Sequence, residues 1–465
     1  MGILKGVYRW LDHRLGIWAA LRPTLLHPVP RKVNWWYVLG SAALFAFVFQ
    51  VITGVALAFS YVPSPDAAYD SLVFITDEAT LGSVVRGIHY WGASAMVVLV
   101  TAHMIHVFLT GSYKYPRELN WLTGVLLLAL TLAMAFTGQL LRWNQDAYWG
   151  LVVAAQQAGR APLIGDLLVQ LLVAGQTVGG ATLTRFYATH VFLLPALMFL
   201  LIGTHVYLVL RHGVSEPPVP GEPVDPATYE ERYEEILRTD GVPFWPGSAW
   251  RDVIFALAVG AVVVAAAVLV GPAELGVRAD PTNVDAYPRP DWYFLWYFAL
   301  LALIPPATET WVILGFPLVV GIVLLALPFL SNKGERSPRR RPWAVGIVGV
   351  SGLGVAVLLW AGLRAPWSPV VPPPELPPQV TEGLTGTSRQ GAALFQQEAC
   401  ISCHRIAGRG GEYGPDLTHV ADRLSREQMT WRILYGGGGM PAYGATLSPA
   451  ETQALLDFLQ TRRGP

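Results

Sequence analysis

Charged side chains are scarce in this chain of 465 residues. Only 14% of the residues are Asp, Glu, Lys or Arg, whereas 53% are hydrophobic. Because soluble globular proteins carry roughly 25% charged residues, the chain has too few charges for a surface that faces only water. Acidic and basic side chains balance at 32 each, so the net charge does not point to any partner, nucleic acid included.

Cysteine is scarcer still. The chain contains two cysteines, Cys400 and Cys403, which excludes a framework of disulfides. A signal peptide is also missing, because the first 32 residues hold six basic side chains and no long apolar core. We therefore expect no cleavable leader in this sequence.

Long apolar runs, by contrast, are abundant. A helix needs about 20 apolar residues to cross a bilayer, and seven runs reach that length. They lie near residues 33–60, 84–110, 121–141, 186–210, 252–271, 311–330 and 343–363. Two shorter runs, at 162–175 and 292–304, are typical of interfacial or re-entrant segments.

The remaining segments define the domain organisation. Residues 211–250 are expected to form a polar loop, and the proline-rich stretch "APWSPVVPPPELPPQV" at 365–380 an extended, semi-rigid tether. The last 80 or so residues have the composition of a soluble domain. We predict an all-α protein, in which seven transmembrane helices precede a small helical domain. The predicted units are residues 1–212, 213–364, 365–384 and 385–465.

Basic residues predict the orientation in the membrane. With a cytoplasmic N-terminus, loops on the cytoplasmic side contain 17 Lys or Arg and those on the opposite side contain 6. The positive-inside rule favours this arrangement. Seven crossings then place the C-terminal domain outside the cytoplasm. Lys114 and Arg117, on the cytoplasmic side, could face a quinone or an anionic lipid.

Histidines recur at matched spacings inside two apolar runs. His89 and His103 are 14 residues apart, and His190 and His205 are 15 apart. At about 100° per residue each pair returns nearly to one helix face, displaced by about 21 Å. Two such helices can ligate two flat cofactors from both sides, and bis-histidine haem is a group that satisfies buried imidazole. The alternative is ordinary hydrogen bonding between helices.

Glycines share this spacing. Gly40 and Gly54 are 14 residues apart, as are Gly124 and Gly138. A side chain at these positions would collide with a porphyrin packed between the helices, and glycine allows the close approach. Helix–helix packing through small residues is the alternative explanation.

The segment "CISCHRIAG" indicates a covalent haem in the soluble domain. Thiols at Cys400 and Cys403 can bond both vinyl groups, and His404 can bind the iron. A structural zinc site would need further ligands. The sixth ligand is predicted to be Met440, in the glycine-rich "GGGGMPAYG", with Met429 as the competing candidate.

These motifs resemble a known family. "RGIHYWGASAMVVLVTAHMIHVF", "YKYPREL" and "TLTRFYATHVFLLP" look like cytochrome b of the cytochrome bc1 and b6f complexes, over about residues 1–363. The resemblance implies a four-helix domain with two non-covalent b haems, followed by three helices. It pairs His89 with His190 near the outer side, and His103 with His205 near the cytoplasm. Residues 388–463 resemble a class I cytochrome c.

Three further residues are interpreted by comparison with this family, and two of them depart from its pattern. Arg86 is expected either to bind a haem propionate or to be a basic residue at the membrane surface. Val38 stands where the b6f type has a cysteine that attaches an extra haem, which should therefore be absent. His106 replaces an arginine and could bind a propionate, line a quinone pocket or lie at the interface.

The resemblance also indicates a quinol-oxidising pocket. Asp291, Trp292 and Tyr293 resemble the family's PEWY motif, and a carboxylate there can accept a proton from quinol. A surface-loop aspartate is the alternative. Residues 138–150, "GQLLRWNQDAYWG", resemble the facing pocket segment, except that Arg142 replaces the usual proline.

Together these features imply the core subunit of a quinol:cytochrome c reductase in a bacterial cytoplasmic membrane, coupled to proton translocation. Both cysteines are committed to haem, so a Rieske iron–sulfur protein must be a separate subunit. The membrane quinone pool, a downstream cytochrome or oxidase, and a homodimeric complex are the other implied partners. A di-haem anchor for a dehydrogenase, without quinol bifurcation, is the alternative, and a transporter or scaffold with buried histidines is a third.

Overall fold

The computed structural model describes residues 2–175, 178–281, 283, 288–364, 374–411, 414–436 and 440–464. Within them the protein is mostly helical, as predicted. Residues 365–373, most of the expected tether, lie outside the described residues.

Seven helices in the described part of the chain are long and apolar enough to cross a membrane, which confirms the predicted spans. They are Trp35–Ala58, Gly82–Leu109, Glu118–Leu140, Gly180–His212, Phe244–Leu269, Ala307–Leu330 and Pro342–Arg364. The corresponding helices are α3 (Leu39–Ala58), α5 (Gly82–Leu109), α6 (Glu118–Leu140), α9 (Gly180–Ala188) with α10 (Leu194–His212), α12 (Ala249–Leu269), α14 (Pro306–Leu330) and α15 (Pro342–Arg364).

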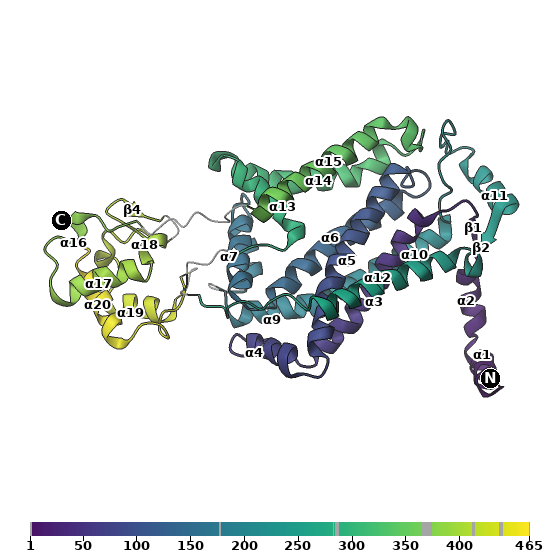
Figure 1. Cartoon of the computed structure of the whole chain (residues 1–465). Helices are drawn as coiled ribbons and strands as arrows, with labels where there is room; N and C mark the ends of the chain where they lie inside the picture. The colour runs from purple at the N-terminus through teal and green to yellow at the C-terminus, as the bar shows by residue number, and fades with distance from the viewer. Residues whose placement is uncertain are drawn as a thin grey trace.

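A four-helix bundle of α3, α5, α6 and α9–α10 forms the centre of the membrane part (Figure 1). Its core cluster includes Ala42, Ala46, Phe47, Met96 and Met198. The small side chains of α3 allow α5 to pack closely along it, and α12 covers both helices. Helix α14 packs on α6, and α15 packs on α5 and on the short helix α13 (Trp292–Leu303); both lie along one side of the bundle in Figure 1.

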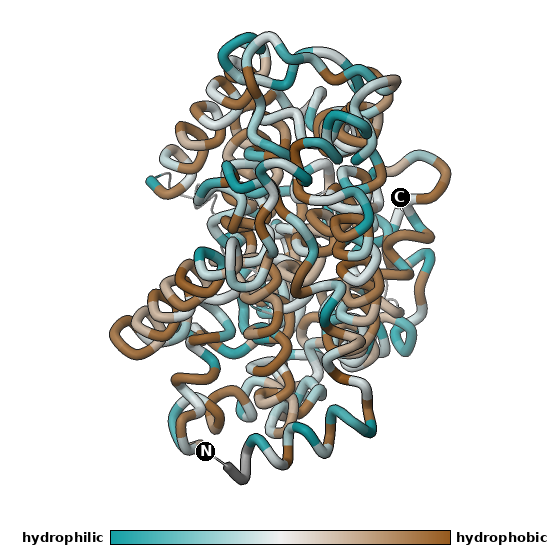
Figure 2. Tube along the Cα trace, turned by 90° about the vertical axis from the view of Figure 1, so that its right-hand side faces the viewer, coloured by the Kyte–Doolittle hydropathy of each residue, from teal (hydrophilic) through white to brown (hydrophobic). Residues whose placement is uncertain are grey.

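The outer faces of these helices expose apolar side chains. Leu257 of α12, Phe329 of α14 and Leu353 of α15 are each more than 60% exposed. Figure 2 shows hydrophobic residues concentrated along the long helices and hydrophilic residues in the loops between them. Apolar surface of this extent requires lipid or protein contact.

One end of the bundle carries the N-terminal elements and the long polar segment (Figure 1). Here α1 (Gly2–Leu15) and α2 (Ile17–Leu25) precede β1 (Pro28–Pro30), which pairs antiparallel with β2 (Gly241–Pro243). The segment 211–250, expected to be a loop, contains α11 (Tyr229–Asp240) as well as β2. We call this the α11 end.

The opposite end carries short helices. They are α4 (Ala68–Val73), α7 (Gln145–Gly159), α8 (Gly165–Val173) and α13 (Trp292–Leu303). The last two correspond to the predicted short apolar segments. The C-terminal domain lies beyond this end, which we call the α7 end (Figure 1).

The C-terminal domain is a small helical unit. It contains α16 (Pro378–Thr381), α17 (Gly386–Gln397), α18 (Cys400–Cys403), β3 (Arg405–Ile406), β4 (Arg409–Gly410), α19 (Arg426–Tyr435) and α20 (Pro449–Gln460). Helices α17 and α20 cross where Gly391 faces the Ala454 carbonyl, which a Cβ would overlap. Phe395 and Phe458 pack at this crossing, with ring centroids 5.6 Å apart.

Candidate cofactor sites

Two pairs of histidines face each other across the four-helix bundle. His89 of α5 faces His190, with ring centroids 6.4 Å apart, and His103 faces His205 at 6.5 Å. The interplanar angle is 80° in both pairs. Two metal–imidazole bonds of about 2 Å each, plus half of each ring, account for such a separation. The structure thus brings together the four histidines in the pairs that the family resemblance implied.

Three of the four imidazoles also share a hydrogen-bond pattern. In each, Nδ1 lies close to a threonine hydroxyl on the neighbouring helix. The pairs are His89 with Thr53 (2.9 Å), His190 with Thr137 (3.0 Å) and His205 with Thr123 (2.8 Å). Each hydroxyl donates its own proton to the carbonyl four residues earlier, at 2.7 to 2.9 Å.

This pattern sets the imidazole tautomer. Because the threonine proton is used within its own helix, its oxygen accepts the proton of Nδ1. The lone pair of Nε2 is then available on the other side of the ring, the atom that a metal ion binds. The donor set therefore fits haem iron between the rings. Hydrogen bonds between helices, which the alternative expects, are present at three of these imidazoles, and they use Nδ1 and leave Nε2 available.

The four predicted glycines lie against the four imidazoles, one to each. A Cβ added to Gly138 would lie 2.7 Å from the His190 ring. The corresponding distances are 3.1 Å for Gly40 to His103, 3.2 Å for Gly54 to His89 and 3.6 Å for Gly124 to His205. The glycines therefore make room for the imidazole rings. The sequence had led us to expect that they make room for the porphyrin.

A single cavity joins the His89–His190 pair to the predicted quinol segment. Asp291, Trp292 and Tyr293 line it together with both imidazoles. Asp291 precedes α13, and the Tyr293 hydroxyl donates to its Oδ2 at 2.7 Å. Burial, followed by the adjacent carboxylate, raises the pKa of Tyr293, so its hydroxyl stays protonated. The indole of Trp292 donates to Ser94 at 3.2 Å.

The first part of the segment 138–150, up to Arg142, lines the same cavity at the end of α6. With its amide nitrogen toward the carboxylate, Gln139 donates to Asp291 Oδ2 at 3.2 Å and accepts from Arg142 at 3.2 Å. Arg142 thus reaches Asp291 through one amide. Tyr148, further along the segment, is only 6% exposed, and burial raises its pKa to about 12.

Arg86 lines the cavity too. Its guanidinium donates to the Thr76 hydroxyl at 3.1 Å and to the Ala273 carbonyl at 2.7 Å. These bonds hold the start of α5 against the segment after α12. The expected contact with a propionate stays a prediction.

The motif of the C-terminal domain also contains a histidine whose Nδ1 is hydrogen-bonded and whose Nε2 is available for a metal. Cys400 and Cys403 bound the single turn α18, and neither forms a disulfide. His404 follows at once and donates from Nδ1 to the Pro415 carbonyl at 2.9 Å, which leaves Nε2 for a metal. A Cβ at Gly414 would lie 2.5 Å from this ring. These residues fit a covalently attached haem.

The two candidate methionines lie in different surroundings. Met440 is partly buried and packs against the edge of the domain core. Met429 is 3% exposed within the core itself, on α19. The described contacts therefore favour Met440 as the residue with a thioether available.

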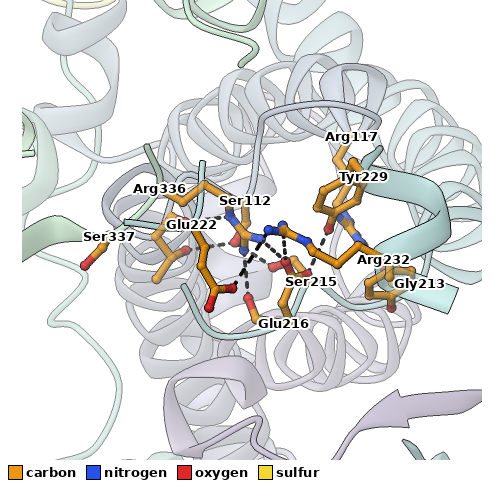
Figure 3. A network of polar contacts seen from close by, with 12 residues as sticks. Ser112, Arg117, Gly213, Ser215, Glu216, Glu222, Tyr229, Arg232, Arg336 and Ser337 are labelled. Atoms are coloured by element: carbon orange, nitrogen blue, oxygen red, sulfur yellow. Dashed lines mark hydrogen bonds and ion pairs between the residues drawn. The ribbon is translucent and has the colours of Figure 1, made fainter. Parts of the chain in front are cut away.

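A polar network at the α11 end was not found from the sequence (Figure 3). Arg336 donates to Glu216 Oε1 at 2.6 Å, and Tyr229 donates to Glu216 Oε2 at 2.8 Å. Arg117 donates to the Tyr229 hydroxyl at 2.7 Å. Lys114 donates to the carbonyls of Ser331 and Lys333 at 2.8 and 2.7 Å.

This network corrects one expectation. Lys114 and Arg117 are 3% and 6% exposed and contact protein groups, rather than facing a quinone or lipid. They join the turn after α5 to α11 and to the loop between α14 and α15. No local pattern predicts these contacts, because the partners are about a hundred or more residues apart in the chain.

Comparisons with known proteins agree with this architecture. Three family models match: "Cytochrome b/b6/petB" over residues 25–213, "Cytochrome b(C-terminal)/b6/petD" over 278–372, and "Cytochrome C oxidase, cbb3-type, subunit III" over 386–459. The fold and the facing histidines define an integral membrane protein that binds haem and serves electron transport. The chain belongs to the cytochrome b family and carries an additional C-terminal cytochrome c domain.

Individual relatives cover different parts of the chain. Cytochrome b of Cereibacter sphaeroides is 32% identical over 381 residues, which are 77% of this chain and 83% of that protein. Cytochrome b6 of Heliomicrobium gestii is 41% identical over 211 residues, 45% of this chain and 99% of that protein. A solved structure titled "Hyperthermophilic respiratory Complex III" is similar with a TM-score of 0.65 and 27% identity, covering 84% of this chain and 95% of that chain.

Proposed function

We propose that the chain is the redox core of a quinol:cytochrome c reductase and carries two b haems and one c haem. The observation that carries this proposal is the single cavity lined by Asp291 and by the His89–His190 pair. A quinol bound beside Asp291 would lie next to the first proposed haem. Haem at both histidine pairs supplies one-electron acceptors that carry charge across the membrane.

The pocket residues have distinct parts in this reaction. Asp291 accepts a proton from the quinol hydroxyl. Tyr293 holds one carboxylate oxygen by its hydrogen bond, and Gln139 links the carboxylate to the positive charge of Arg142. This arrangement orients the carboxylate toward the cavity. Trp292, anchored on Ser94, forms part of the wall.

The two histidine pairs provide a path through the bilayer. His89 and His103 are separated by 14 residues of one helix, or about 21 Å. The His103–His205 pair then lies toward the α11 end, which the excess of basic residues assigns to the cytoplasm. Quinone reduction is proposed at that side, and oxidation at the α7 end outside the cytoplasm.

The C-terminal domain would accept the other electron. Its haem is proposed to be bonded to Cys400 and Cys403 and ligated by His404 and Met440. A separate Rieske protein would deliver the electron, and a downstream cytochrome or oxidase would remove it. We keep the division into units 1–212, 213–364, 365–384 and 385–465, and a homodimeric complex, as parts of the proposal.

Steady-state quinol oxidation by the purified complex tests the proposal. Asp291→Asn should lower the rate about 100-fold, the smaller end of a general base contribution, with both b haems retained. Asp166→Asn, on the exposed face of α8, is the matched control and should leave the rate unchanged. Unaltered turnover in the Asp291 variant would remove this carboxylate from the mechanism. Activity that persists without a Rieske subunit would instead favour the dehydrogenase anchor.

A further inference from the structure

We infer that Thr53, Thr123 and Thr137 are positioning residues for three of the four proposed b-haem ligands, and that Leu39 leaves the fourth, His103, without such a partner. The haem between His103 and His205 would then be ligated by two unequal imidazoles. This inference rests on the haem ligation proposed above and goes beyond it.

The difference between His103 and the other three histidines is visible in the sequence, at the residue that precedes each facing glycine. Three of the glycines that face an imidazole directly follow a threonine, in Thr53-Gly54, Thr123-Gly124 and Thr137-Gly138. The fourth pair is Leu39-Gly40. At the equivalent place on α3, an isobutyl group stands where the other sites have a hydroxyl.

The geometry at His103 agrees with this difference. The ring lies against Gly40 as the other rings lie against their glycines, with the Cβ position 3.1 Å from Cε1 and 3.5 Å from Nδ1. Its Nδ1 is buried and has no hydrogen-bond partner among the described residues. Leu39 is 7% exposed and packs in the apolar core with Met96 and Leu99.

The consequence is electronic. A hydrogen bond from Nδ1–H to an acceptor raises the basicity of Nε2, so the imidazole donates more strongly to a metal. Stronger donation favours ferric over ferrous iron and lowers the midpoint potential, since outer hydrogen bonds are one of the means by which proteins set it. Of the four imidazoles, that of His103 is therefore the weakest donor.

If the threonines only stabilise their own helices, a different result is expected for the haem potentials. Threonines in membrane helices often bond to the carbonyl four residues earlier, and all three here do so. If that bond were their whole contribution, replacing the hydroxyl by a methyl group would leave the haem potentials unchanged. The reduction potential thus separates positioning from helix packing.

The test is a potentiometric titration of the b-haem absorbance bands in the intact purified complex. Leu39→Thr supplies the missing acceptor, and Leu39→Val controls for its shape. We expect Leu39→Thr to move one b-haem potential more negative than Leu39→Val does. Thr123→Val should move the same potential more positive and weaken haem retention about 10-fold, and Thr123→Ser should restore both values.

The outcomes are distinguishable from failure of the proposed function. Absence of extractable haem b from the wild-type complex would overturn the ligation itself. Wild-type haem content with equal potentials in Leu39→Thr and Leu39→Val, and no change in Thr123→Val, would overturn the inference alone. If Leu39→Thr does not assemble, the comparison of Thr123→Val with Thr123→Ser decides the question.

Discussion

The glycines facing the imidazoles allow a graded prediction. In Gly138→Ala, the new methyl carbon would lie 2.7 Å from the His190 ring, about 0.7 Å short of the 3.4 Å at which ordinary contact begins. A metal–ligand distance tolerates about 0.2 Å. The ring must therefore move by more than ligation allows, and we expect Gly138→Ala to lose the haem of that pair.

The other three positions provide the scale. Gly124→Ala places its methyl carbon 3.6 Å from His205, which is ordinary contact, so it is the matched control and should retain haem. Gly40→Ala and Gly54→Ala, at 3.1 and 3.2 Å, should be intermediate.

The assay is the content of acid-extractable haem b per purified chain, together with the reduced-minus-oxidised spectrum of each variant. All four substitutions add one methyl group to a membrane helix, so their effects on helix stability are comparable. Full haem retention in Gly138→Ala together with loss in Gly124→Ala would refute the reasoning, because the order of effects is set by the distances alone.

Three further predictions concern stability and covalent attachment. Glu216→Gln leaves the Arg336 guanidinium, 3% exposed, without its counter-charge, so the free energy of unfolding, measured by thermal unfolding, should fall by about 3–5 kcal/mol. The control is Glu222→Gln: the Glu222 side chain is 57% exposed, so the free energy of unfolding should fall by about 1 kcal/mol or less. Burial lowers the pKa of Lys114 from 10.5 to about 8. Between these two pH values the unfolded chain holds a proton that the folded chain has released, so the free energy of unfolding of the wild type relative to Lys114→Met should rise with pH. A difference between the two proteins that does not change with pH would contradict the lowered pKa of Lys114. Finally, acidic acetone should extract two haems from the wild-type chain and leave one attached, whereas the double replacement of Cys400 and Cys403 by serine should leave none.

The spans and the histidine pairs were accessible from the sequence for a simple reason. The length of an apolar run is set by bilayer thickness, and the face on which a residue lies is set by the helical repeat. Both are local properties, so the 14-residue spacing of His89 and His103 already places them on one face. The attachment motif at Cys400 to His404 is local in the same way.

The candidate pocket was only partly accessible. Asp291 was predicted from its neighbours in the chain, but its connection to Arg142 through Gln139 joins residues about 150 positions apart. The role of Lys114 was misjudged for the same reason, because a lysine in a loop gives no sign of the carbonyls that surround it after folding.

The sequence alone determined which segments are able to cross the membrane, which imidazoles share a face and where the motif predicted to attach a haem lies, because each depends on spacing along one helix or one turn. Tertiary structure alone decided which threonine accepts from which imidazole, that His103 has Leu39 beside it instead, and that Glu216 neutralises Arg336. These contacts depend on how separate helices are turned and displaced against one another, and that is settled by the packing of the whole bundle.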